Sequence, residues 1–73
     1  MEAKKRFGLK IKELRENLGL TPKQLADRSS LSITQISLVE NGEHNPNVIT
    51  IAKLAQSLNH SYDELYNIAM GIK

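Results

Sequence analysis

A fold of five short α-helices and no strands is predicted by three features of this 73-residue sequence. Aromatic residues make up only 4% of the chain, and Leu, Lys, Glu, Gln and Ala are frequent, which favours helices over strands. Apolar residues recur three and four positions apart in most segments. Three of these segments begin with Ser or Thr followed three residues later by Gln or Glu, which is a helix start signal. The length suits a single small domain.

Several classes of function are disfavoured by the composition. The chain has no cysteine, which excludes disulfides, thiolate metal sites and cysteine nucleophiles, and two histidines are too few for a metal cage, so we expect no metal and no cofactor. No nucleophile elbow or glycine-rich phosphate loop is present, so we expect no enzyme activity. No apolar run approaches the length of a membrane span, and the N-terminus lacks the apolar core of a secretory signal. We therefore expect a cytoplasmic protein that does not enter membranes.

The net charge of +2 is unevenly distributed. Residues 1–15 hold six of the ten basic residues and two acidic ones, a balance of +4, whereas residues 16–73 hold four basic and six acidic residues, a balance of −2. A basic N-terminal segment of this kind either lies over an anionic partner or forms a solvent-exposed helix face.

The first predicted helix covers about residues 5–18. Its apolar residues are spaced so that they share one face, and the chain can turn at a glycine directly afterwards. The residues concerned are Phe7, Ile11, Leu14 and Leu18, followed by Gly19.

The second predicted helix runs to about Ser29 and buries Leu25 and Ala26. Thr21 is its N-cap, because Pro22 suits the first helical position and Gln24 completes a capping box.

The third predicted helix, at about residues 32–41, repeats the pattern. Ser32 and Gln35 form the capping box, Ile36 and Val39 face the core, and Gly42 ends the helix.

The last two predicted helices follow Asn47 and Ser61, which serve as N-caps. The fourth ends at Asn59, a residue that tolerates a left-handed conformation. The fifth begins with a capping box between Ser61 and Glu64 and reaches Gly71. The apolar stripe of the fourth comprises Ile51, Leu54, Ala55 and Leu58.

The second and third helices are separated by about three residues, 30–32. Two short helices joined by so tight a turn cross steeply, as in the helix-turn-helix. Such a pair can place its second helix in the DNA major groove and direct helix N-termini at phosphates. Helix pairs of this kind also occur in purely structural bundles, so spacing alone leaves both interpretations open.

The residues of this pair and its surroundings resemble the Cro/C1-type (XRE) helix-turn-helix family, whose members are compact five-helix, lambda-repressor-like domains. The resemblance covers residues 5–68, with residues 69–73 as a C-terminal tail available to a dimer. It implies a transcriptional regulator that binds double-stranded DNA sequence-specifically, as a homodimer on a palindromic operator, usually as a repressor at the nucleoid. The matching residues are segment 19–26, Leu31, Ser32, Ile36, Ser37, segment 39–42, Pro46, Leu54, Ala55, Leu58 and segment 61–65.

The resemblance also implies roles for individual residues. Arg15 and Glu40 match a structural ion pair that ties the first helix to the end of the third. The positions that match base-reading ones are Ile33, Thr34, Ser37 and Leu38. The positions expected to contact the DNA backbone are Thr21, Lys23, Gln35, Asn41, His44 and Asn45. For Gln35, as for Gln24, helix capping is the alternative role.

Three departures from the family pattern affect these expectations. Pro22 replaces a glutamine that contacts phosphate, and Lys23 beside it is the substitute. Ile33 and Leu38 are apolar where polar readers are common, which predicts contacts with thymine methyl groups. Ser30 replaces a glycine before the turn, at a cost of about 1 kcal/mol if the residue is left-handed.

The C-terminal helix has more apolar residues than one core-facing stripe needs. We expect a homodimer through this helix, with Leu65, Tyr66, Ile68 and Met70 at the interface. The alternative function is a protein–protein module that binds a regulatory protein partner through the apolar third helix or through this C-terminal helix.

Overall fold

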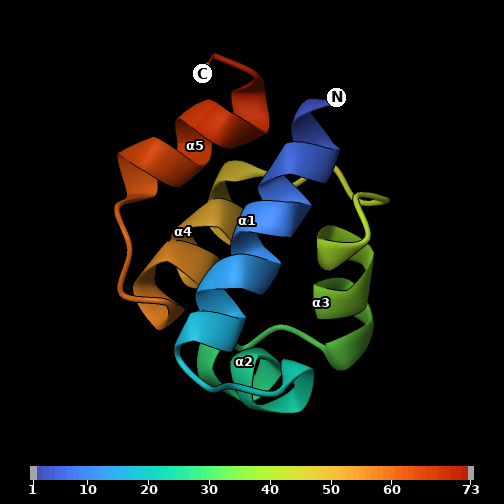
Figure 1. The fold of residues 1–73 in the computed structure, drawn as a ribbon, viewed down its shortest axis with the longest axis vertical. Coiled ribbons are helices and arrows are strands. Elements are labelled where there is room, and N and C mark those ends of the chain that lie inside the picture. Colours follow the sequence, from blue (N-terminus) through green and yellow to red (C-terminus); the bar gives the residue numbers. More distant parts are fainter. Residues whose placement is uncertain (1, 73) are drawn as a thin grey trace.

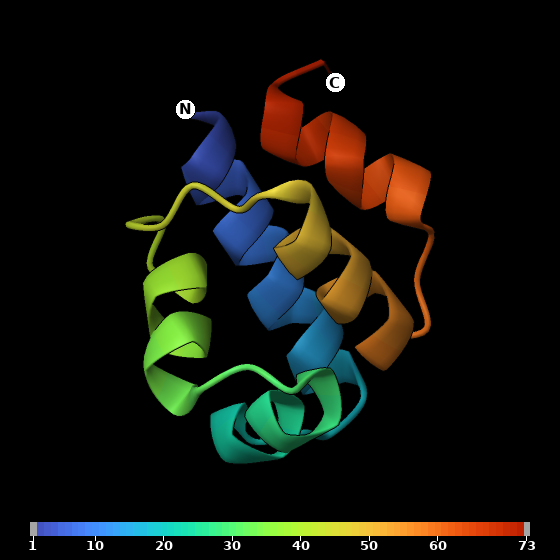
Figure 2. The ribbon, with the colours of Figure 1, turned by 180° about the vertical axis from the view of Figure 1, so that it is seen from behind.

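Residues 2–72 are described by the computed structural model, and within them the fold consists of five α-helices without strands. Figure 1 shows α1 crossing the front of the domain between α3 and α5, and Figure 2 shows α4 from behind. The predicted fold class is therefore confirmed. The helices are α1 (Ala3–Asn17), α2 (Pro22–Ser29), α3 (Ile33–Glu40), α4 (Val48–Ser57) and α5 (Tyr62–Met70).

The helix boundaries follow local signals, with two differences from expectation. α1 ends at Asn17, and Leu18 is its C-cap with 49% of its surface exposed, so the prediction that Leu18 belongs to the apolar face is wrong. It lies past the last helical residue, where the chain turns into Gly19. At α5, the Ser61 hydroxyl accepts a hydrogen bond from the Glu64 amide as expected. The Glu64 carboxylate pairs with His60, so the reciprocal half of the predicted capping box is replaced.

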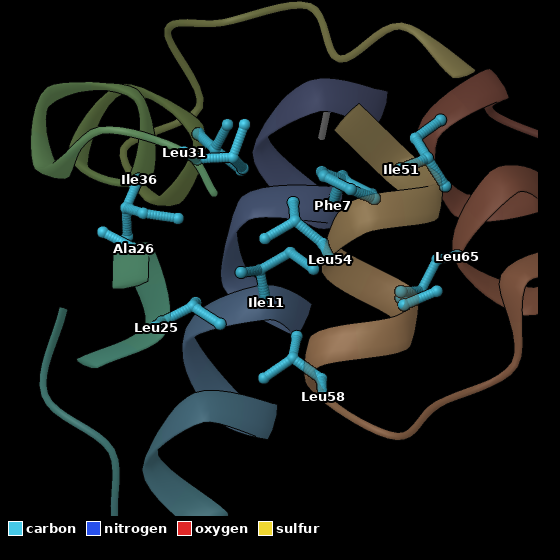
Figure 3. Close-up of a cluster of buried hydrophobic side chains, with 12 residues drawn as sticks. Phe7, Ile11, Leu25, Ala26, Leu31, Ile36, Ile51, Leu54, Leu58 and Leu65 are labelled. Carbon is cyan, nitrogen blue, oxygen red and sulfur yellow. The ribbon is translucent and has the colours of Figure 1, made fainter. Parts of the chain in front are cut away.

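One apolar cluster, drawn in Figure 3, joins all five helices. Phe7 and Ile11 of α1 lie against Leu54 of α4, and every one of these three side chains is fully buried. Burying each such side chain contributes about 1.5–3 kcal/mol. The other members are Leu25, Ala26, Leu31, Ile36, Val39, Ile51, Ala55, Leu58 and Leu65.

The place of Leu65 in this cluster corrects the expected dimer surface. Leu65 is fully buried, so the prediction that it is available to a second subunit is wrong. α5 packs on both α1 and α4, and its apolar residues are used to cover these two helices. Tyr66 and Ile68 are half-buried against the cluster, and Met70, within α5, is 46% exposed. Of the expected tail 69–73, Lys73 lies outside the described residues.

α1 and α3 approach each other closely at Gly8. A Cβ atom added to Gly8 would lie 2.2 Å from the carbonyl oxygen of Val39 and 2.9 Å from that of Glu40. Real Cβ atoms do not come this close to backbone oxygens. The absence of a side chain at Gly8 therefore lets the last turn of α3 rest directly on α1.

A buried ion pair joins the same two helices. The Arg15 Nε atom donates to Glu40 Oε2 at 2.7 Å and the Nη2 atom to Glu40 Oε1 at 3.2 Å, while Nη1 donates to the carbonyl oxygen of Leu20 at 2.8 Å. Both charged side chains are only 9% exposed. The hydrogen bonds that the Arg15 guanidinium donates to Glu40 raise the pKa of this guanidinium, so it stays charged. The expected structural pair is present, and it also fixes the turn that precedes α2.

We predict that Gly8→Ala destabilises the domain by about 1–3 kcal/mol, because the new methyl group overpacks the α1–α3 contact. Intrinsic helix propensity alone predicts the opposite effect, because alanine in a helix raises the free energy of unfolding by about 1 kcal/mol relative to glycine. Urea unfolding followed by circular dichroism separates the two outcomes. A variant more stable than the wild type would contradict the close approach.

We predict that Glu40→Ala costs about 3 kcal/mol or more, because it leaves the Arg15 charge buried without its partner. The matched control is Glu43→Ala, which removes an exposed carboxylate. The double variant Arg15→Met with Glu40→Leu should recover most of the lost stability, since it removes both charges. Equal melting temperatures for Glu40→Ala and Glu43→Ala would rule out a stabilising role for the pair.

Candidate nucleic-acid interface

The turn between α2 and α3 is set by Ser30. This residue is left-handed, with φ of 61°, and ends α2. The next amide, of Leu31, donates to the carbonyl oxygen of Ala26 at 3.1 Å, and the Leu31 side chain enters the core. Ser30 therefore adopts the left-handed conformation for which a cost of about 1 kcal/mol relative to glycine applies. The chain thereby turns sharply and sets α3 at a steep angle to α2 (Figure 2).

Both helices begin with complete capping boxes, as predicted. Thr21 Oγ1 accepts from the Gln24 amide at 3.1 Å, and Gln24 Oε1 accepts from the Thr21 amide at 2.8 Å. The corresponding two distances between Ser32 and Gln35 are 3.0 Å each. The side-chain oxygen of Gln35, Oε1, thus accepts a hydrogen bond in the cap. Its amide NH₂ is the group that remains suitable for donating to a phosphate.

The outer face of α3 carries the four residues expected to read bases. Ile36 and Val39 are fully buried and hold the helix on the core. On the opposite side Thr34 and Ser37 are exposed, and Ile33 is 50% exposed. Leu38 is half-buried. This face is uncharged, so it offers methyl groups and two short hydroxyl groups to whatever it contacts.

The residues expected to contact the DNA backbone lie at the start of α2 and after α3. Thr21, Lys23, Asn41 and Asn45 are exposed, and His44 is half-buried. The Lys23 Nζ atom lies 3.8 Å from Asp27 Oδ2, with both side chains 72% exposed. An exposed pair of this kind contributes about 0.3–0.5 kcal/mol, so it holds the lysine only weakly.

One neighbour of this surface is missed by sequence reasoning. A Cβ atom added to Gly42, in the loop after α3, would lie 2.6 Å from Cγ and 2.9 Å from Cα of Lys5. The first turn of α1 therefore packs on this loop, which passes beside the N-terminal end of α1 in both ribbon views (Figures 1 and 2). No sequence signal could have shown this, because the two residues belong to separate elements far apart in the chain.

Two surface depressions, of about 520 and 580 Å³, are lined by no residue of α3. They share Arg6 and Ile68 and lie between α1 and α5, across α1 from α3. Among residues 2–72 no three His, Asp or Glu side chains are grouped so that they could hold a metal ion. In the same part of the chain, no helix has the length and apolar character that crossing a membrane requires. The exposed face of α3, rather than a cavity, is the candidate site.

Comparison with known proteins gives matches along most of the chain. Residues 11–65 match the family model described as helix-turn-helix. The HTH-type transcriptional regulator y4dJ of Sinorhizobium fredii, itself uncharacterised, is 40% identical over 65 residues, which cover 89% of this chain and 84% of that protein. The HTH-type transcriptional repressor RghR of Bacillus subtilis is 43% identical over 60 residues. That alignment covers 81% of this chain and 44% of RghR, so the chain spans less than half of this longer relative.

The fold is likewise similar to a solved structure. The crystal structure of the restriction-modification controller protein C.AhdI from Aeromonas hydrophila has a TM-score of 0.81 and 35% sequence identity. The superposition covers 85% of this chain and 94% of that one. With the helix-turn-helix geometry described above, these matches show that the chain belongs to the Cro/C1-type (XRE) helix-turn-helix family of DNA-binding transcriptional regulators.

Proposed function

We propose that this protein is a sequence-specific transcriptional repressor that binds a palindromic operator in double-stranded DNA as a homodimer. The observation that carries the proposal is the outer face of α3, where Thr34 and Ser37 are exposed while Ile36 and Val39 are fully buried. A helix anchored on one side and free on the other fits the major groove, which is about 12 Å wide.

The chemistry of this face determines what it would read. Thr34 and Ser37 can donate to or accept from base edges, and Ile33 and Leu38 supply apolar contacts for thymine methyl groups. Because α3 presents no Arg or Lys, the operator would be recognised through A·T pairs rather than through bidentate guanine contacts. The phosphate contacts would come from Thr21, Lys23, Gln35 and the loop after α3, including Asn41, His44 and Asn45, which flank the outer face of α3.

The repressor role is supported by the similarity to RghR, which is named a transcriptional repressor. A small domain seated in the major groove of a promoter excludes other proteins from the same site. Repression therefore needs no activity beyond binding.

The proposed homodimer uses apolar residues left exposed in the single chain. Met70 at the end of α5 is 46% exposed, and Val48 and Ile49 at the start of α4 are 53% and 62% exposed. α4 begins and α5 ends toward the end of the domain that carries the chain termini (Figures 1 and 2). Covering these residues with a second copy would remove apolar surface from water, and the twofold axis would match a palindromic site. Tyr66 and Ile68 would contribute only their exposed edges.

We predict that alanine substitutions of Ile33, Thr34, Ser37 and Leu38 separate operator binding from folding. Operator affinity should fall by about 1–3 kcal/mol at the most important positions, while non-specific binding changes little. At the exposed positions the unfolding free energy should change by about 0.5 kcal/mol or less. The operator is first selected from randomised duplexes, and the variants are then compared by gel shift.

Two controls sharpen this comparison. Replacing operator thymine with uracil removes the methyl group and should reproduce the loss seen for Ile33→Ala or Leu38→Ala. Lys23→Ala should weaken binding to all sequences alike. Variants at Ile33 and Leu38 that leave DNA binding unchanged but abolish binding of a partner protein would replace this proposal with a protein–protein module.

We predict that Met70→Glu and Ile49→Glu each shift the protein from dimer to monomer, because each buries a charge in the proposed interface. Leu9→Glu is the matched control, since Leu9 is 53% exposed on α1 and takes no part in that interface. Analytical ultracentrifugation and operator affinity should change together. A wild-type monomer at high micromolar concentration that binds a palindrome with full affinity would contradict the homodimer.

A further inference from the structure

The loop that follows α3 is poor in positive charge for a segment expected to lie along phosphates. Residues 42–45 contain no Lys or Arg, and Glu43 adds a negative charge. The loop also follows the C-terminus of α3, where the helix dipole is negative. A phosphate approaching this loop therefore meets an unfavourable field unless a cation lies nearby.

The structure provides such a cation from another element. Lys5 lies in the first turn of α1, and its Cα, Cβ and Cγ atoms all lie within 3.2 Å of the position that a Cβ atom of Gly42 would occupy. The glycine thus removes the atom that would push the two segments apart. The Lys5 side chain is exposed, so its charged end lies at the surface beside the loop.

Lys5 differs from Lys10 and Lys23, each of which lies near a carboxylate on its own helix. Lys10 lies 3.5 Å from Glu13, and Lys23 lies 3.8 Å from Asp27. Within residues 2–72, Lys5 forms no ion pair with an acidic side chain. Its ammonium group is therefore available to an external anion.

We propose that Lys5 binds a DNA phosphate next to the loop after α3, so that α1 supplies the positive charge that this loop lacks. The inference rests on the proposed DNA binding and adds a contact outside the helix-turn-helix. Gly42 contributes to the contact in two ways. Its φ of +73° turns the chain away from the helical path after α3, and its lack of a side chain leaves room for Lys5. The phosphate strand would then be held between the loop and the first turns of α1.

The test is the salt dependence of binding to a short duplex of arbitrary sequence, measured by fluorescence anisotropy between about 0.05 and 0.2 M salt. We expect about four to six neutralised phosphates in a wild-type dimer, hence a log–log slope of roughly −4 to −5. Lys5→Gln should reduce the slope by about 0.9 per protomer. Near 0.15 M salt, counterion release then gives a loss of about fivefold in affinity per protomer. Glutamine keeps the Cβ and Cγ atoms that pack on Gly42, and Lys5→Arg should restore binding.

The matched control is Lys10→Gln, which removes the same charge from the same helix. Lys10 borders the depression that contains Ile68, on the α5 side of α1, so its loss should change affinity by less than about twofold. Equal effects of Lys5→Gln and Lys10→Gln would overturn the Lys5 contact while leaving DNA binding intact. A wild-type protein without affinity for the duplex at the lowest salt would overturn the proposed function itself.

Discussion

The position of α3 depends on the buried ion pair between Arg15 and Glu40. Its two hydrogen bonds fix the C-terminal turn of α3 on α1, and the third bond of the guanidinium, to the Leu20 carbonyl oxygen, fixes the chain before α2. Gly8 permits the close approach that this pair requires, since any side chain there would meet the backbone of α3. One charged residue of α1 thus positions both helices of the helix-turn-helix.

This anchoring is needed because α3 is short. Eight residues span about 12 Å, and isolated helices of this length are not stable in water. The capping box at Ser32 provides hydrogen-bond acceptors for backbone amides at the start of the helix. The buried Ile36 and Val39 hold one side of the helix on the core, and the ion pair holds its last turn. These three stabilising contacts lie at the ends or on the inner side of the helix. The residues on the outer side of α3 are therefore not constrained by folding, and their chemistry can suit a binding partner. Ile33, which is 50% exposed, is one of these residues.

The features that could be predicted from the sequence are those that depend on residues close together in the chain. The caps at Thr21 and Ser32 depend on neighbouring residues, so the helices and the tight turn between them were predictable from pattern alone. The partner of Arg15 came only from resemblance to the family. Leu65 was misjudged because the amount of apolar surface that α5 must cover depends on the packing of α1 and α4. The contacts of Gly8 and of Lys5 join elements distant in the chain, and no periodicity encodes them.

The most direct test of the central claim is a nuclear magnetic resonance titration of the folded chain with a duplex selected from randomised DNA. If α3, held at its inner side by α1, is the DNA-reading element, the backbone amide signals of Thr34, Ser37 and Gly42 should shift with the first additions of DNA. The amide signals of Leu9 and Ile68, at the depression between α1 and α5, should stay unchanged. Shifts confined to that depression, with α3 unaffected, would contradict this account of the protein.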